Sequence, residues 1–267
     1  ESISGIALGC IYALIALGFT LIYKASEVVN FAQGEVMMVG AYVNFFFVSY
    51  FSSMVGEVNG WVFLLAFLGS IIFAVIFGIT LDFIINRPLK DEPVFSIIMA
   101  TISLGIILRA LTALIAGPIS LVPQSPFGGS VMEVGGVVVS YLDLSIIFSA
   151  VVLMGLFFVF FNKTRWGIAM KATSEDSEAA QLMGIPVKKV YMIVWVFAAI
   201  VGVVSGILLA PRMSLLDTSM GFLGLKAFPA AILGGFGSIP GAVVGGIILG
   251  VIETVSMGTL SFHFSWI

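Results

Sequence analysis

A short polar segment between two apolar stretches carries the first side chains that could bind a ligand. They are Asn30, Phe31, Gln33, Gly34 and Glu35. A helix that begins among such residues points its N–H groups and its positive dipole end at a polar ligand. Residues 26–35 are therefore either a plain loop before the next helix or a helix interruption inside the protein that lines a pathway. The shortness of the following apolar run, 36–51, favours the interruption.

A second break lies within 228–246, where glycines remove side chains and a serine and a proline suit a new helix start. The candidate pathway residues here are Gly234, Gly235, Gly237, Ser238 and Pro240. Unwound backbone at membrane depth is tolerated only where protein or water surrounds it. The small-xxx-small pairs Gly241/Gly245 and Gly246/Gly250 predict close packing of the following helix, which could coexist with a pathway role. One break in each half suggests a duplicated architecture with the pathway between the halves.

The longest polar connector, 162–189, contains a third candidate. Thr173 and the acids after it predict a capped amphipathic helix over about 175–183, lying off the membrane and ended by Gly184 and Pro186. It is either a capped connector or a segment that docks into a groove of a soluble partner. The residues predicted to make that contact are Ser174, Glu175, Asp176, Ala179, Leu182, Met183 and Gly184.

Charges inside apolar runs are functional candidates in a membrane protein. Arg109 and Glu253 lie deepest, and we expect them to pair with each other or with a neighbouring subunit. Asp82, Asp143 and Lys226 are expected at the interfaces, where long side chains can reach water. No chain of Asp, Glu and His crosses the apolar runs, which argues against a proton relay.

Other chemistry is disfavoured. We predict no catalytic residues, because the sequence lacks paired carboxylates and a nucleophile–base set. We predict no metal site, because Cys10 and His263 are the only cysteine and histidine. Cys10 itself suits a small buried apolar side chain. The absence of a Gly-Lys pair rules out a phosphate-binding loop, so no cofactor is expected in this chain.

The elements that must position these residues are transmembrane helices. Apolar residues make up 60% of the 267 residues and charged residues only 9%, too few to cover a soluble fold or to bind nucleic acid. A spanning helix needs about 20 apolar residues. The runs that qualify are 2–23, 60–85, 94–116, 141–161 and 190–210, with the shorter 36–51 and the interrupted 222–257. We predict an all-α polytopic membrane protein with short and broken helices, and strands are not expected.

Lysines and arginines give the orientation. Eight of the eleven lie in the alternate connectors 24–35, 86–93 and 162–189, whereas the opposite connectors hold only Arg212. The positive-inside rule places 162–189 in the cytoplasm and the N-terminus outside. Residues 1–267 are expected to form a single transmembrane domain, truncated at one or both ends.

Several motifs resemble the LivH-type permeases of branched-chain amino-acid ABC importers, and the resemblance runs from about residue 5 to 258. They are the apolar stretch at 5–24, Asn-Phe-Ala-Gln-Gly-Glu at 30–35, Gly-Ala-Tyr at 40–42, the loop at 172–185 and the glycine-rich stretch at 224–241. The resemblance implies about eight transmembrane helices in the full chain, in the inner membrane of a prokaryote. It also implies alternating access driven by two cytoplasmic ATPases that dock on 172–185 and carry the ATP and Mg²⁺. A homologous second permease and an extracytoplasmic solute-binding protein would complete the importer.

The substrate stays open between branched-chain amino acids, other amino acids, and urea or short amides. The family usually has His at the position of Gln33 and Ala or Thr at that of Pro229, and both differences fall in the break regions. Related permeases carry urea or short amides. An ion-coupled secondary transporter is the main alternative from another class, although it would need more ionisable residues within the membrane. A passive channel or a scaffold without transport fits the polar breaks less well.

Overall fold

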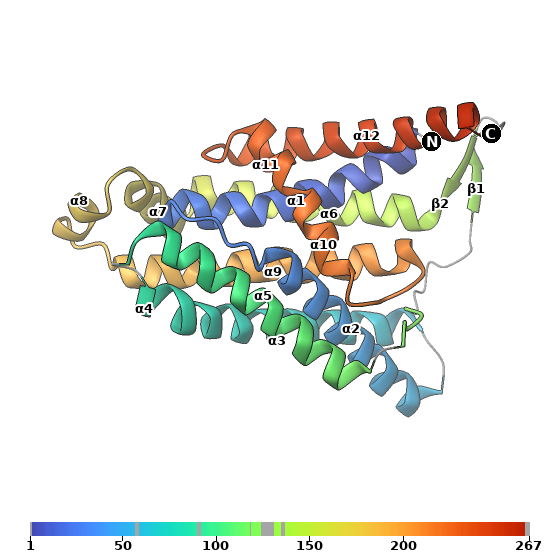
Figure 1. Ribbon diagram of the computed structural model, residues 1–267, viewed down its shortest axis with the longest axis horizontal. Coiled ribbons are helices and arrows are strands. Elements are labelled where there is room, and N and C mark those ends of the chain that lie inside the picture. Colours follow the sequence, from blue (N-terminus) through green and yellow to red (C-terminus); the bar gives the residue numbers. More distant parts are fainter. Residues whose placement is uncertain are drawn as a thin grey trace.

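The computed structural model is a bundle of long helices with short helices at its breaks (Figure 1). It describes residues 2–56, 59–89, 92–117, 119–123, 131–134 and 137–264. Within these residues seven helices are long and apolar enough to cross a membrane. The all-α polytopic prediction is confirmed. The long helices are α1 (Ser2–Ser26), α2 (Gln33–Val55), α3 (Gly60–Leu81), α5 (Val94–Ala116), α6 (Tyr141–Lys163), α9 (Val187–Met213) and α12 (Ile239–Phe264).

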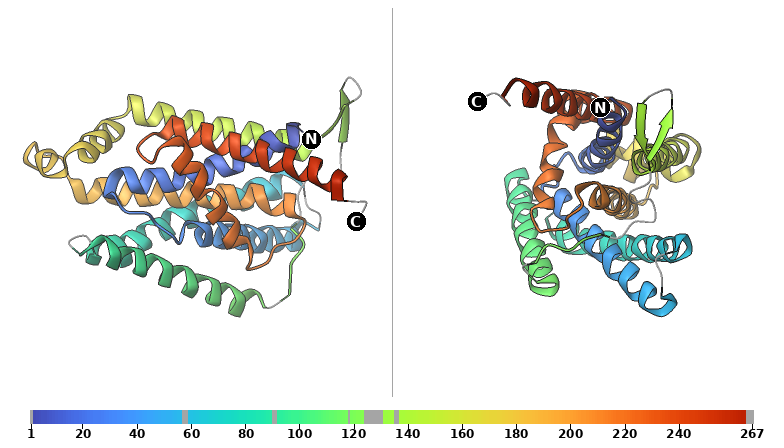
Figure 2. Two further views of the ribbon diagram at one scale, coloured as in Figure 1. Left: turned by 45° about the horizontal axis from the view of Figure 1, so that its top comes forward. Right: turned by 90° about the vertical axis from the view of Figure 1, so that its right-hand side faces the viewer.

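Helices α1 and α9 form the centre of the bundle, and their spans are the most buried. The other long helices surround them, as Figure 2 shows in the view along the bundle. Glycines bring α12 against α1: a side chain on Gly250 would overlap the backbone of Gly9, and one on Gly246 would overlap Ala13. Gly241 and Gly245 approach the preceding helix in the same way. The close packing predicted from the small-xxx-small pairs is confirmed.

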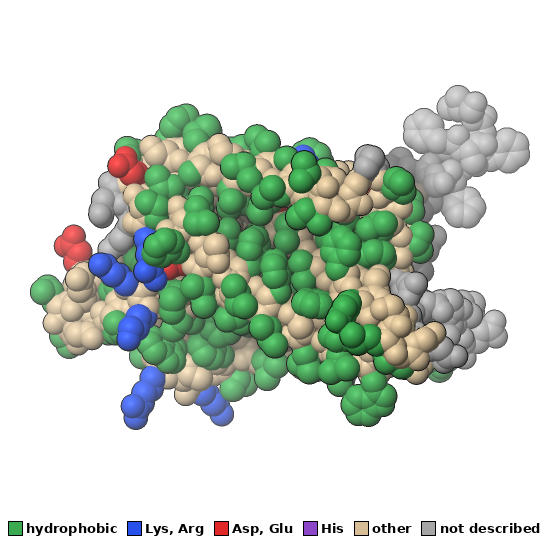
Figure 3. Space-filling view, turned by 90° about the horizontal axis from the view of Figure 1, so that it is seen from below, with side chains coloured by type: hydrophobic (Ala, Val, Ile, Leu, Met, Phe, Trp, Pro, Cys, Tyr) green, Lys and Arg blue, Asp and Glu red, His purple; other side chains and the backbone are tan. Residues whose placement is uncertain are grey.

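The short elements lie at the ends of the bundle and at the breaks. They are η1, a π-helix (Asp82–Asn86), α4 (Arg87–Leu89), α7 (Arg165–Glu175), α8 (Ser177–Leu182), α10 (Met220–Lys226) and α11 (Phe228–Gly234). On the face seen in Figure 3, Lys and Arg gather at the end that carries α7 and α8. This is the end that the positive-inside rule assigns to the cytoplasm.

The sequence-based length of the second span was wrong. Helix α2 has 23 residues rather than the 16 or so of the apolar run 36–51. It begins with Gln33 and continues through two serines near its end, where the Ser53 hydroxyl donates to the Tyr50 carbonyl 2.7 Å away. A serine bonded back to its own helix is compatible with helix, so the polar end did not mark a boundary.

Two further expectations need correction. The cytoplasmic connector holds two helices within the described residues, not one over 175–183. Thr164 caps the start of α7, and the extended backbone at Asp176 separates the end of α7 from α8. The Asp176 carboxylate, rather than Thr173 or Ser174, caps α8 by accepting from Glu178 N and Ala179 N. Strands also occur: β1 (Val131–Val134) pairs antiparallel with β2 (Val137–Ser140) in the connector before α6. Hairpin partners a few residues apart pair locally, outside the apolar runs that guided the prediction.

Candidate translocation pathway

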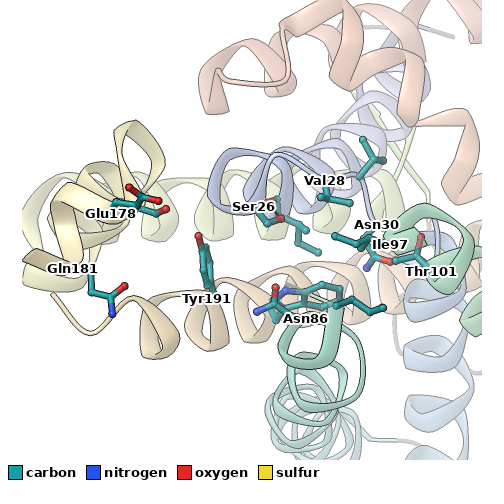
Figure 4. A pocket seen from close by; sticks show the side chains of 14 residues that line it. Ser26, Val28, Asn30, Asn86, Ile97, Thr101, Glu178, Gln181 and Tyr191 are labelled. Atoms are coloured by element: carbon teal, nitrogen blue, oxygen red, sulfur yellow. Dashed lines mark hydrogen bonds between the residues drawn. The ribbon is translucent and has the colours of Figure 1, made fainter. Parts of the chain in front are cut away.

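A cavity of about 360 Å³ lies between the end of α1, the first helix break and the cytoplasmic helix α8 (Figure 4). Helices η1, α4, α5 and α9 complete its wall. One end is lined by exposed side chains, Glu178 and Gln181, and the other by the buried Asn30 and Thr101. The cavity therefore opens beside α8 and ends at the break. Its described lining is Ile22, Ser26, Val28, Val29, Asn30, Asn86, Leu89, Ile97, Thr101, Ser177, Glu178, Gln181, Tyr191 and Trp195.

Asn30 forms part of the buried end and has an unused donor. Its side chain oxygen Oδ1 accepts a hydrogen bond from Ala32 N at 3.0 Å, as in an Asx turn, which identifies the other amide atom as Nδ2. Nδ2 is buried and has no hydrogen-bond partner in the structure. An unpaired buried donor costs about 1–3 kcal/mol. Asn30 was predicted as a pathway residue, and the structure places it on the cavity.

Thr101 of α5 attaches the break to the bundle. Its hydroxyl donates to the Ile98 carbonyl at 2.9 Å and accepts from Phe31 N at 3.4 Å. The break between α1 and α2 runs from the cytoplasmic end of α1 back into the bundle, as Figure 1 shows. The interruption favoured from the shortness of 36–51 is thus present, although the helix after it is long.

The π-helix η1 brings Asn86 to the cavity wall. Asn86 Nδ2 donates to Asp82 Oδ1 at 2.7 Å, and Arg87 Nε donates to Asp82 Oδ2 at 3.0 Å. Asp82 is fully buried, and it lies at the end of the α3 span, consistent with the expected position near the cytoplasmic end of that helix. The network leaves Asn86 Oδ1 as the amide atom available to the cavity. Sequence reasoning missed Asn86 and Thr101, although the spacing of Asp82, Asn86 and Arg87 at the end of an apolar run was a usable signal.

The rest of the polar cluster turns away from the cavity into the bundle. Gln33 is buried and donates from Nε2 to the Ala198 carbonyl at 3.0 Å, in a space that Gly18 and Gly202 leave open. Gly34 packs against the backbone of α10. These residues hold the start of α2 in place, and their predicted contact with a substrate stays a prediction.

The buried Glu35 carboxylate forms an ion pair with the partly buried Arg109 of α5, and the Arg109 guanidinium lies 3.7 Å from the centre of the Phe222 ring. Gly105 and Gly221 leave room for the carboxylate. The expected pairing of Arg109 with Glu253 is wrong, because α5 lies against α2 rather than α12.

Glu253 instead accepts from the Tyr12 hydroxyl at 2.7 Å and from Lys226 Nζ at 3.0 Å. Asp143, expected at an interface, forms an ion pair with Arg212, whose guanidinium also donates to Ser4. Arg109, Glu253 and Asp143 are thus each paired with an opposite charge of the same chain.

The second break meets the first through aromatic rings. The Phe228 ring lies 5.5 Å from that of Phe31 and 5.4 Å from that of Phe236, which in turn lies 4.7 Å from the Tyr23 ring. The turn between α11 and α12 contains the predicted residues Gly235, Gly237 and Ser238, while Gly234 ends α11 and Pro240 lies in the first turn of α12. Gly235 has a φ of 83°, and the Ser238 hydroxyl accepts from Gly241 N. This turn contributes nothing to the described lining of the cavity.

The cavity's open end is lined by three residues of α8, Ser177, Glu178 and Gln181, and none of these was among the predicted coupling residues. Of the predicted ones in α8, Ala179 is exposed, and its neighbour Ala180 is buried. Leu182 and Met183 are 89% and 85% exposed, and Gly184 has a φ of 85° where the chain turns toward α9. Ser174 and Glu175 end α7, and Asp176 caps α8. Among the described residues, no group of three His, Cys, Asp or Glu could hold a metal ion.

Comparison with known proteins gives consistent matches along the chain. Residues 2–266 match the family described as branched-chain amino acid transport system / permease component. The chain is 33% identical to the high-affinity branched-chain amino acid transport system permease protein LivH of Escherichia coli K12, over 99% of this chain and 87% of that protein. It is 34% identical to BraD of Pseudomonas aeruginosa over 95% of this chain and 84% of that protein.

A more distant relative is a probable branched-chain amino acid transport permease from Methanocaldococcus jannaschii, 28% identical over 91% of this chain and 76% of that protein. No solved structure matches significantly. The spans and the permease relatives together make this a multi-pass protein of the inner membrane. With a family match from residue 2 to residue 266, the chain belongs to the permease components of branched-chain amino acid transport systems.

Proposed function

We propose that this chain is the transmembrane permease subunit of an ATP-binding-cassette importer that moves branched-chain aliphatic amino acids by alternating access. The observation that carries the proposal is that one cavity is bordered both by the helix break at Asn30 and by the cytoplasmic helix α8. A partner that moves α8 would therefore act directly on the wall of the pathway. The names of the relatives support the substrate class.

The cavity suits a net-neutral solute. Its wall combines aliphatic side chains with neutral amides and hydroxyls, and the charged Glu178 lies at the open end. A zwitterionic amino acid needs hydrogen bonds at one end and an apolar surface for its side chain, without a strong fixed charge. Selectivity would come mainly from a solute-binding protein, so a weak site in the permease is sufficient and allows release.

The remaining parts of the importer are proposed as partners. A homologous second permease would complete the pathway, and an extracytoplasmic binding protein would deliver the solute. Two cytoplasmic ATPases would dock on α8, where Leu182 and Met183 offer an apolar surface to water. ATP and Mg²⁺ would bind to those subunits, and this chain would be a transport subunit rather than an enzyme.

Reconstitution tests the proposal against its alternatives. Liposomes that contain the permease pair and the ATPases, supplied with binding protein, are expected to accumulate labelled leucine only with ATP. Uptake of urea or acetamide instead of leucine would show that the substrate belongs to the short amides rather than to the amino acids. Uptake that collapses with an uncoupler while ATP is held constant would indicate an ion-coupled transporter and would refute the ABC assignment.

Substitutions at Glu175 or Gly184 are expected to uncouple ATP hydrolysis from uptake. A Gly184→Ala side chain at φ 85° is strained by about 1–2 kcal/mol and would shift the turn that holds α8. Glu175→Ala changes the junction between α7 and α8. We expect hydrolysis to continue while leucine uptake falls several-fold, measured in the same liposomes. Gly155→Ala is the control, since no atom lies within 4 Å of the added carbon. Normal uptake and ATPase docking in both coupling variants would refute the role of this segment.

A further inference from the structure

We infer that the cavity holds an amino-acid site in which Asn30, at the buried end, binds the substrate's α-carboxylate and Asn86 binds its α-ammonium group. This inference rests on the proposed function and adds which residues bind the substrate and which charged group of the substrate each one binds. The two amides come from different elements, the break before α2 and the π-helix η1, and both line the same cavity (Figure 4).

The donor is Asn30 Nδ2. Because Oδ1 already accepts from Ala32 N, the side chain cannot turn over without losing that bond, so Nδ2 keeps its position on a residue that lines the cavity. It is buried without a partner, which costs free energy in the empty protein. A ligand carboxylate would satisfy it with a charge-assisted hydrogen bond, which is stronger than one between neutral groups.

The acceptor is Asn86 Oδ1. Asn86 Nδ2 donates to Asp82, so the oxygen is the atom left for a ligand, and an ammonium group needs acceptors only. Asp82 is itself paired with Arg87, and this network fixes the amide orientation without placing a bare charge at the site. π-Helical turns such as η1 are rare and occur often at functional sites.

The apolar wall fits the rest of an aliphatic amino acid. Ile22, Val28 and Ile97 line the same cavity as the amides, and its volume lies within the roughly 300–1,000 Å³ of small-molecule pockets. Glu178 lies at the opposite end from Asn30 in Figure 4. Since both charged groups of an amino acid sit on one carbon, Glu178 cannot hold the ammonium while Asn30 holds the carboxylate. Recognition thus uses neutral amides, which gives weak binding.

Protection of a cysteine tests this site directly. Ile97→Cys, in the complete transporter with Cys10→Ser, is labelled with an aqueous methanethiosulfonate reagent without ATP. L-Leucine at millimolar concentration is expected to slow labelling. Leucinamide, which lacks the carboxylate, and 4-methylpentanoate, which lacks the ammonium, are expected to need about tenfold higher concentration. Asn30→Ala should remove the preference for leucine over leucinamide, and Asn86→Ala the preference over 4-methylpentanoate.

Asn44→Ala is the matched control, because Asn44 is another buried amide that does not line this cavity. It lies in α2 and donates a hydrogen bond to Ser70 of α3. It should leave both preferences unchanged. Equal protection by all three compounds, or retained preferences in Asn30→Ala and Asn86→Ala, would overturn the site. If the unaltered transporter accumulates leucine but shows no protection, this site is wrong while the proposed function stands. If it accumulates no leucine, the proposed function itself fails.

Discussion

Replacing Arg109 with alanine is expected to lower the free energy of unfolding by about 3–5 kcal/mol, as breaking one side of a buried ion pair does. Glu35 would then be left charged and buried in the first turn of α2, with no other charged partner among the described contacts. The loss should appear as a lower melting temperature of the purified permease in detergent.

A double variant separates charge from packing. Arg109→Met with Glu35→Gln removes both charges while keeping similar volume, and we expect it to recover most of the lost stability. Lys226→Ala is the control: Lys226 is half-exposed, and Glu253 would keep the hydroxyl of Tyr12. If the double variant melts as low as Arg109→Ala, the guanidinium stabilises through its contact with Phe222 rather than through charge.

Alanine at Gly34 or Gly224 is expected to disrupt the contact between α2 and α10. The added carbon at Gly34 would overlap the Gly221 carbonyl, and at Gly224 it would overlap Gly34 itself. These neighbours are backbone atoms, so a whole helix would have to move. Overpacking of this kind costs about 1–3 kcal/mol. Because Asn30 lies four residues before Gly34, we also expect leucine uptake to fall by an order of magnitude or more.

Gly237→Ala is the matched control for that loss, since no atom lies within 4 Å of the added carbon and the backbone is not left-handed there. Melting temperature and uptake are measured for all three variants. Equal behaviour of Gly34→Ala and Gly237→Ala would contradict the view that backbone contact between α2 and α10 positions the break.

Helix existence was predictable from the sequence because apolar length is a strong signal in membranes. Helix ends were not. Whether Ser53 continues α2, or Pro211 and Arg212 continue α9, depends on partners: Ser53 bonds to its own helix, and Arg212 pairs with Asp143 across the bundle. Local composition holds no information about a partner 69 residues away.

The candidate site was predictable in part. Asn30 stood out because polar side chains are costly within an apolar region, and it lines the cavity. Gln33 and Glu35 stood out for the same reason but turn into the bundle, where Ala198 and Arg109 are their partners; these partners lie far away in the sequence. Thr101 gave no signal in the sequence, because it is a single threonine in an apolar span. It meets the break only because the chain turns back into the bundle after α1 and brings Phe31 N to its hydroxyl.

The glycine contacts between α1 and α12 have a mechanical consequence. Sliding α12 by one residue, about 1.5 Å, would bring side chains such as that of Ile247 onto backbone where a glycine now lies. We therefore expect the two helices to move together, with any hinge movement at other joints. Helix α12 contributes nothing to the described cavity lining, whereas Ile22 and Ser26, at the end of α1, form part of the cavity wall. A push on the outer surface of α12 would thus reach the cavity through α1.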